Sequence, residues 1–263
     1  MYPEIHLGPL TLQTFGLMFA LAFLAAGALV AKRLKEIGKP VDWAYEIGFA
    51  ALIGGIVGSR LYFVVQNYDS VKDDLVGSLL GGSGLVWYGG AIGGAIAVLL
   101  WAWRRDFLRL ALLDLAAPAL ALGYAVGRIG CQLSGDGDYG KAWDGPWAMS
   151  YPDGTVPTTE EVHPTPIYEA LVMGFGAWLL WQLRDRFRAG VLFAIYLVYA
   201  GAERFAVEFL RRNSDVALGL TSAQLESLAM MLIGVGWLYL AKRRHGTLSR
   251  EAAPSGAGSR SAA

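Results

Sequence analysis

The sequence predicts an all-α integral membrane protein with seven transmembrane helices. Hydrophobic residues make up 55% of the 263-residue chain and charged residues only 17%, and the mean hydropathy is +0.41. About seven apolar runs are long enough to cross the hydrocarbon core of a bilayer, which takes roughly 20 residues in a helix. A soluble domain of this length would not need so many unbroken apolar runs.

The predicted spans form one domain with one long outward loop. We expect residues 1–245 to form a single transmembrane domain, with the loop at about 134–165 and a disordered cytoplasmic tail at 246–263, which is rich in Ser, Ala and Gly. The pair Asp153-Gly154 predicts a small hairpin within 149–156. The seven spans cover residues 11–31, 43–66, 84–103, 110–133, 166–183, 190–210 and 221–241.

The lysines and arginines predict the orientation in the membrane. The connections after spans one, three, five and seven hold four, three, three and three basic residues close to the helix ends. Those after spans two and four hold one each, and that after span six holds two. Because basic residues are enriched on the cytoplasmic side, we expect the N-terminus outside and the C-terminus in the cytoplasm.

The charge and the rare residue types exclude several classes of function. With 22 basic and 22 acidic residues the net charge is zero, so no overall field points to nucleic acid. The single cysteine, Cys131, excludes a disulfide framework within the chain and a multi-cysteine metal site. We expect no metal and no cofactor. All three histidines lie outside the predicted spans.

The strongest candidate for a functional residue is Arg128, near the far end of the fourth span. A glycine-rich turn that contains Asp136 and Asp138 follows it at once. A charge inside a membrane is costly, and for that reason it marks a functional site by default. The flanking glycines let the backbone come close to a bound group, and a lipid phosphate is the group that suits an arginine here.

A second group of charges lies near the end of the sixth span. Arg204, Glu208 and Arg211 are spaced by four and three residues, so they share one face of a helix. Arg204 and Glu208 can pair, either as a structural ion pair or with Glu208 orienting Arg204 toward an anionic group. Arg60 lies near the same outward half of the bilayer, where it either joins this site or extends to the interface.

Two interpretations stay open for several other residues. Gly89 and Gly90 either allow close helix packing or open room for a ligand beside Tyr88. Glu169 is favoured near a helix N-terminus by the helix dipole, which suffices for a structural role.

His163 is a loop residue or a base at the outer mouth. Cys131 is a small apolar filler or a thiol activated by Arg128.

Taken together, these residues resemble the prolipoprotein diacylglyceryl transferase family, over nearly the whole chain. The core of the resemblance is the signature from Gly127-Arg128-Ile129-Gly130 to Gly140. The other matching pieces, in chain order, are Gly8-Pro9, Phe15-Gly16-Leu17-Met18, Gly58-Ser59-Arg60-Leu61, Tyr88-Gly89-Gly90-Ala91-Ile92-Gly93, His163-Pro164 with Tyr168-Glu169, Arg204-Phe205 with Val207-Glu208-Phe209 and Arg211, and Gln224.

The resemblance implies a bacterial enzyme of the cytoplasmic (inner) membrane. Its substrates would be phosphatidylglycerol and prolipoprotein signal peptides with a lipobox cysteine. The diacylglyceryl group moves to the cysteine thiol and glycerol phosphate leaves. The nucleophile belongs to the substrate, so the enzyme needs cations on the phosphate and an acceptor for the thiol proton.

This chemistry suggests roles for the charged residues. Arg128 and Arg204 would hold the phosphate, with Arg60 and Arg211 in secondary positions. Glu208 would orient Arg204. Asp136 or Asp138 would hydrogen-bond the glycerol head group, with Gly89 and Gly90 beside the lipid. Tyr88 would be the catalytic residue from the third span, although a reference pKa near 10 makes a tyrosine a poor base.

The sequence departs from the family pattern at several positions. Tyr88 stands where many members have a histidine, and Phe15 where many have a tyrosine. Cys131-Gln132 and Ser134 replace Asn-Phe and a second Asn of the signature. These departures motivate one alternative, a lipid-binding relative without transferase activity. A second alternative is a small-solute transporter that uses the Arg204–Glu208 pair, for which the sequence offers no inverted repeat.

Overall fold

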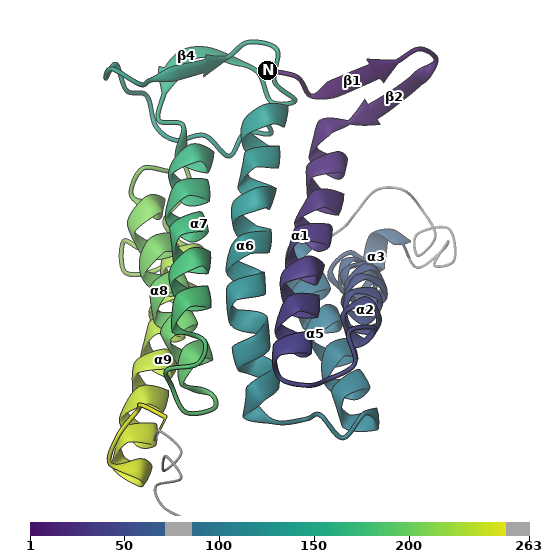
Figure 1. Cartoon of the computed structure of the whole chain (residues 1–263). Coiled ribbons are helices and arrows are strands. Elements are labelled where there is room, and N and C mark those ends of the chain that lie inside the picture. The colour runs from purple at the N-terminus through teal and green to yellow at the C-terminus, as the bar shows by residue number, and fades with distance from the viewer. Residues whose placement is uncertain (72–85, 251–263) are drawn as a thin grey trace, which may run out of the picture. The chain divides into compact units, whose positions relative to one another are not determined.

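Long helices dominate the computed structural model, which describes residues 1–71 and 86–250. Seven helices of 18 residues or more lie in this part of the chain, which confirms a mostly helical protein (Figure 1). They are α1 (Thr14–Glu36), α2 (Trp43–Gln66), α5 (Trp87–Arg104), α6 (Leu110–Ser134), α7 (Thr165–Leu183), α8 (Val191–Glu208) and α9 (Ser222–His245).

Four of these helices are long and apolar enough to cross a membrane, namely α1, α2, α6 and α9. Large apolar side chains also point outward from the helices: Leu24, Phe49 and Val65 are among the exposed hydrophobic residues. In water such surfaces would be costly, whereas lipid covers them without penalty. The chain is therefore a multi-pass membrane protein.

Short elements interrupt the all-helical picture. β1 (Glu4–Leu7) and β2 (Leu10–Gln13) form an antiparallel hairpin, in which Gly8 supplies the positive φ of the turn. The prediction that the first span starts at residue 11 was wrong, because the period-two segment Leu10–Gln13 pairs as a strand. A one-turn helix, α3 (Tyr68–Val71), follows α2. Residues 84 and 85 of the predicted third span lie outside the described residues.

The chain divides into two compact units, and each is described by itself. One unit combines Met1–Ala22 with the chain from Ala116 onward, and the other is Phe23–Leu115.

In the second unit, α2 and α5 pack through glycines on both helices. A Cβ atom at Gly58 would lie 2.7 Å from the Cα atom of Gly93, and one at Gly93 equally close to the Cα of Gly58. Only glycine allows the two backbones to approach so closely. The predicted close packing of helices through glycines is therefore present at Gly58 and Gly93. Glu46 of α2 accepts hydrogen bonds from Trp101 (2.6 Å) and Arg105 (2.6 and 2.9 Å).

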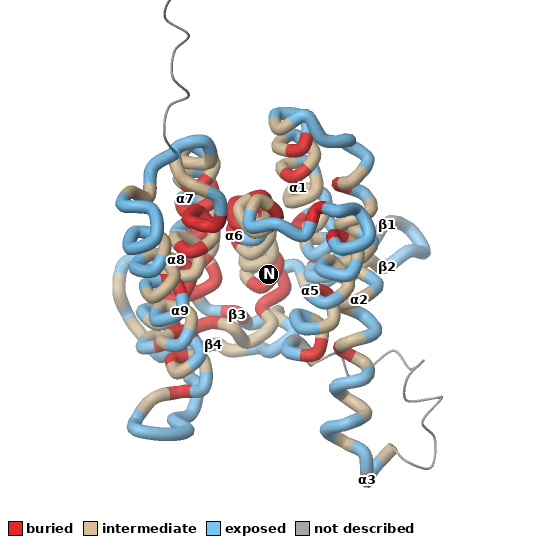
Figure 2. Tube along the Cα trace, turned by 90° about the horizontal axis from the view of Figure 1, so that it is seen from below, coloured by how far each residue is buried: buried red, intermediate tan, exposed pale blue. Residues whose placement is uncertain are grey.

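In the first unit, small residues let α6, α7 and α8 pack together. Figure 2 shows buried residues along α6 and α7. The core of α6 is Ala117, Ala121 and Ala125, four residues apart, and it packs with larger buried side chains that include Met173 and Leu180 of α7. The four-residue spacing gives α6 one narrow apolar face, which leaves other faces free for polar contacts.

The connection between α6 and α7 folds over the ends of these helices (Figure 1). It contains the antiparallel strands β3 (Met149–Tyr151) and β4 (Thr158–Val162). The predicted hairpin is present, but its second strand begins after Val156 instead of within 149–156. Tyr151 of β3 and Val162 of β4 form a buried apolar cluster with Tyr139, and the rings of the two tyrosines stack 4.9 Å apart.

The start of the predicted tail pairs with the connection between α7 and α8. The backbone N–H of Arg188 donates to the carbonyl of Leu248 (3.0 Å), and that of Arg250 donates to the carbonyl of Arg186 (2.9 Å). Residues 251–263 of the predicted tail lie outside the described residues.

Candidate active site

The charged residues of the first unit meet where α6, α7 and α8 approach the connection that contains β3 and β4. Arg128 comes from the last two turns of α6, and α6 ends because Gly135 adopts a positive φ of 61°. Glu169 lies in the second turn of α7, which two prolines at Pro164 and Pro166 start. Arg204 lies in the last two turns of α8, which brings it to the same level.

Glu169 is the centre of this group. Its side chain is fully buried, and its Oε1 atom lies 3.2 Å from Nη2 of Arg128 and 3.2 Å from Nη1 of Arg204. The other oxygen, Oε2, lies 3.6 Å from Nη1 of Arg211. One carboxylate therefore contacts three arginines from two different segments. The sequence interpretation of Glu169 as a helix-end acid missed this role.

Glu208 is the second buried carboxylate. Its Oε2 atom lies 3.0 Å from Nη2 of Arg204 and 3.7 Å from Nε of Arg211. The predicted Arg204–Glu208 pair is therefore present, and Arg211 lies on the same side as expected. Its Oε1 atom accepts hydrogen bonds from Asn213 (2.6 Å) and from the hydroxyl of Thr221 (2.9 Å). The last two contacts have no signal in the sequence, because both partners lie beyond the end of α8.

Asp138 completes the group from the glycine-rich connection. One of its oxygens pairs with Arg128, and the other lies 2.5 Å from Nη2 of Arg211. Its backbone carbonyl accepts from the hydroxyl of Thr165 (2.6 Å) and from Arg211 (3.1 Å). Burial would raise the pKa of Asp138, but Arg128 and Arg211 together hold it below its usual value.

These six residues are named here the arginine–carboxylate cluster: Arg128, Arg204, Arg211, Asp138, Glu169 and Glu208. Three positive and three negative charges balance, which lowers the cost of burying them together. The carboxylates differ in access: the side chain of Asp138 is 32% exposed, whereas those of Glu169 and Glu208 are 0% exposed. Of the three carboxylates, Asp138 is therefore the one that an anion in solution can reach.

A family model described as prolipoprotein diacylglyceryl transferase matches residues 4–240. The chain belongs to this family.

Relatives named phosphatidylglycerol–prolipoprotein diacylglyceryl transferase extend over most of the chain. One from Clostridium tetani is 34% identical, over 86% of this chain and 92% of its own. One from Burkholderia orbicola is 30% identical, over 95% of this chain and 96% of its own. A third, from Methylobacillus flagellatus, is 32% identical, over 91% of this chain and 96% of its own. The resemblance inferred from the motifs is thus confirmed.

The signature of the diacylglyceryl transferase family provides further polar groups beside the cluster. Oδ1 of Asp136 accepts from the backbone N–H of Asp138 (3.3 Å). Ligand atoms of Cys131, Asp136 and Asp138 lie within 4.8 Å of one another, a spacing that also suits a metal ion. However, Asp138 already pairs with two arginines, and Nη1 of Arg128 lies 3.8 Å from the Cys131 sulfur. Such positive charge works against a metal ion there.

Two positions where the chain departs from the family pattern lie in different units. Phe15 lies against α6 in the first unit: a Cβ atom at Gly130 would be 3.7 Å from its ring. Tyr88 lies in the first turn of α5 in the second unit, with its side chain exposed.

Arg60 in α2 and Gly89 and Gly90 in α5 also belong to the second unit. A Cβ atom at Gly89 would collide with the carbonyl oxygen of Gly58, so this glycine is needed for packing. At Gly90 the nearest atom would be the carbonyl oxygen of Gly55 at a normal 3.5 Å. Of the predicted site residues, the cluster thus unites Arg128, Arg204, Glu208, Arg211 and Asp138, with Asp136 beside it.

His163 is held in the connection between α6 and α7 by aromatic neighbours. Its ring stacks on Trp143 with centroids 4.4 Å apart, and its Nδ1 atom lies 3.4 Å from the Tyr168 hydroxyl. Burial lowers the pKa of His163, which favours the neutral ring at pH 7. These contacts fix His163 within the connection, and the neutral ring is also the form that can accept a proton, so both interpretations remain.

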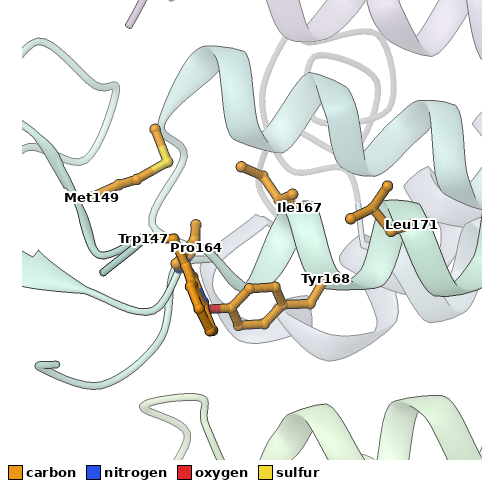
Figure 3. Close-up of a pocket in the computed structure, with 6 residues that line it drawn as sticks. All are labelled: Trp147, Met149, Pro164, Ile167, Tyr168 and Leu171. Atoms are coloured by element: carbon orange, nitrogen blue, oxygen red, sulfur yellow. The ribbon is translucent and has the colours of Figure 1, made fainter. Parts of the chain in front are cut away.

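Apolar cavities adjoin the start of α7. Figure 3 shows the first, of about 300 Å³, with the Trp147 indole beside the hydroxyl of Tyr168, to which it donates a hydrogen bond of 2.7 Å. A second cavity, of about 230 Å³, shares Ile167 and Leu171 with the first and reaches Ile129 of α6. The lining is almost entirely apolar, as expected for a surface that faces lipid chains.

Proposed function

We propose that this chain transfers the diacylglyceryl group of phosphatidylglycerol to the lipobox cysteine thiol of prolipoproteins. The observation that supports this most is the arginine–carboxylate cluster, in which three arginines converge near the outward connection. The names of the relatives indicate the same two substrates. An anionic lipid and a membrane-inserted signal peptide both reach such a site from the bilayer.

In the proposed reaction the sulfur of the lipobox cysteine attacks the diacylglycerol carbon that bears the phosphate ester. The carbon–oxygen bond breaks, its electron pair stays on the phosphate oxygen, and glycerol phosphate leaves. The thiol proton goes to an acceptor and from there to water. Negative charge grows on the leaving phosphate, so arginines fixed beside it stabilise the transition state more than the ground state.

The cluster residues have distinct proposed roles. Arg128 and Arg204 hold the phosphate, and Arg211 supports it. Glu208 orients Arg204, and is itself held by Thr221 through a 2.9 Å hydrogen bond.

The phosphate must compete with carboxylates that already occupy the arginines. Asp138 is the most exposed of them, and its side chain can rotate while its backbone carbonyl stays bonded to Thr165 and Arg211. We therefore assign Asp138 to this exchange and Asp136 to the hydrogen bond with the glycerol head group.

Residues of the second unit, Phe23–Leu115, have further proposed roles in substrate binding. Arg60 is a secondary cation for the phosphate, and Gly89 and Gly90 lie beside the lipid. Tyr88 orients substrate instead of acting as the base, because an ordinary phenol is protonated at pH 7. The immediate proton acceptor is not assigned to a residue.

We further propose a setting for this reaction. Residues 1–245 form one domain of seven spans in the bacterial inner membrane, with the N-terminus and the connection at 134–165 outside and the C-terminus in the cytoplasm. The alternating numbers of basic residues in the connections support this orientation. It puts the cluster on the side where signal peptides emerge.

The experiment that tests the function uses purified protein, phosphatidylglycerol and a lipobox peptide with one cysteine. Mass spectrometry is expected to find a diacylglyceryl adduct on that cysteine and none on a serine-substituted peptide. Arg128→Ala is expected to lower the rate by about 100-fold or more, as for the loss of a group that stabilises developing charge.

Wild-type protein that is folded and binds phosphatidylglycerol but forms no adduct would refute the transferase. That result would favour a lipid-binding relative without transferase activity, the alternative suggested by Tyr88 and Phe15.

A further inference from the structure

Tyr124 makes two contacts with the cluster that no sequence motif indicates. It lies on α6 one turn before Arg128, and its ring centroid is 4.9 Å from the guanidinium carbon of Arg128. Its hydroxyl donates a hydrogen bond of 2.7 Å to Oε1 of Glu169 on α7. The four-residue spacing places Tyr124 and Arg128 on the same face of the helix, so the ring lies under the guanidinium group.

The hydroxyl acts on an oxygen that two arginines share. Oε1 of Glu169 lies 3.2 Å from Arg128 and 3.2 Å from Arg204. This oxygen therefore accepts from three donors: Tyr124 and Arg128 of α6 and Arg204 of α8. The position of this oxygen fixes the separation of the two arginines, and the tyrosine hydroxyl is the only uncharged donor of the three.

The ring acts on the guanidinium group itself. An arginine over the face of a tyrosine is attracted by the negative π surface, and more so where water is scarce. Arg128 is therefore held by the Tyr124 ring and by Glu169, both on the buried side. Its remaining charged contact is Asp138, the most exposed carboxylate of the cluster.

We propose that Tyr124 is a positioning residue for diacylglyceryl transfer, which holds Arg128 through its ring and Glu169 through its hydroxyl while the outer partner of Arg128 is exchanged. The inference rests on the proposed function. Tyr124 does not touch the reacting atoms. It acts through the two arginines, whose alignment matters most when the phosphate gains its second charge.

The structure offers a matched control. Tyr199 on α8 also crosses to α7, and its hydroxyl donates a 2.6 Å hydrogen bond to the backbone carbonyl of Val172. Tyr199→Phe also removes a tyrosine hydroxyl that links two helices, but its acceptor is a backbone carbonyl and no cluster residue is involved. Any general loss of helix packing should appear in both phenylalanine variants, whereas a positioning effect should appear only at Tyr124.

The test measures kcat and KM for phosphatidylglycerol, together with the thermal unfolding temperature in detergent. We expect Tyr124→Phe to lower kcat about tenfold, the effect of misaligning one charged hydrogen-bonding group. We expect its KM to change less than its kcat, and its unfolding temperature to match that of Tyr199→Phe. Tyr124→Leu, which also removes the ring, should lose considerably more kcat than Tyr124→Phe.

Two results would overturn the inference while leaving the transferase intact. In the first, the wild type is active and the kcat of Tyr124→Phe equals that of the wild type or that of Tyr199→Phe. The other is a loss in Tyr124→Phe that matches its loss of folded protein. A wild type that binds phosphatidylglycerol but forms no adduct would refute the proposed function instead, so the two failures are distinguishable.

Discussion

At the scale of single residues, the proposed exchange of Asp138 for the phosphate explains how an anionic lipid enters a cluster whose charges already balance. Its two oxygens contact Arg128 and Arg211, one each. A phosphodiester also presents two equivalent oxygens, so it can replace the carboxylate between the same two arginines. Adding the lipid without moving Asp138 would leave an excess negative charge at low dielectric, which is costly.

This exchange predicts the effect of Asp138→Asn on lipid binding. The amide keeps the size of the side chain but removes the charge that competes with the phosphate. We expect the Kd for phosphatidylglycerol to fall by roughly tenfold, which corresponds to about 1.4 kcal/mol. Titration of the folded protein with phosphatidylglycerol measures it, with uncharged diacylglycerol as the comparison ligand.

Asp153→Asn, which removes an acid from the same connection, is the matched control and should leave the Kd unchanged. Weaker binding of phosphatidylglycerol by Asp138→Asn would contradict the exchange. It would indicate that Asp138 bonds the glycerol head group, the role that the sequence left open between Asp136 and Asp138.

At the scale of elements, the start of α9 supports the end of α8. Thr221 caps α9 by accepting from the backbone N–H of Gln224, whose side chain accepts from the backbone of Thr221 in return. The same Thr221 hydroxyl donates to Glu208. The cap thereby links a helix N-terminus to a cluster carboxylate.

Helices were the most predictable elements, because apolar runs define them directly. Span two, at 43–66, coincides with α2, and the others differ by a few residues at their ends. The β1–β2 hairpin was missed because its second strand continues directly into the apolar run of α1. The contacts of Glu169 with three arginines were missed for another reason. These arginines are 35 to 42 residues away in the chain, and only the packing of the helices brings them together with Glu169.

At the scale of the whole molecule, the distribution of basic residues predicts which ends of the helices face the cytoplasm. The only cysteine, Cys131, is buried, so single cysteines introduced elsewhere report access with little background. Asp153→Cys lies in the connection between α6 and α7, and Leu108→Cys in the exposed connection between α5 and α6.

We expect a membrane-impermeant maleimide to label Asp153→Cys in intact spheroplasts and Leu108→Cys only after the membrane is opened. The parent protein with Cys131 alone measures the background. Labelling in the reverse order would refute the N-terminus-outside orientation, because both positions depend on the same alternation of basic residues.

The central claim is that the cluster arginines act on the phosphate, and two neighbouring arginines provide its most direct test. Arg211 contacts Asp138, Glu169 and Glu208. The next residue, Arg212, bonds the carbonyl of Gly140 (2.8 Å) and Glu160 (2.6 Å) instead. Both residues tie the end of α8 to the connection between α6 and α7. Because Arg211 is buried whereas the Arg212 side chain is 41% exposed, the two variants are compared at equal amounts of folded protein.

The measurement is the initial rate of diacylglyceryl transfer by Arg211→Ala and Arg212→Ala at equal amounts of folded protein. We expect Arg211→Ala to lower kcat/KM by about 100-fold, and Arg212→Ala to stay within about threefold of wild type, as for a surface ion pair. Equal losses in the two variants, or a larger loss in Arg212→Ala, would contradict the claim that the cluster is the site of phosphate chemistry.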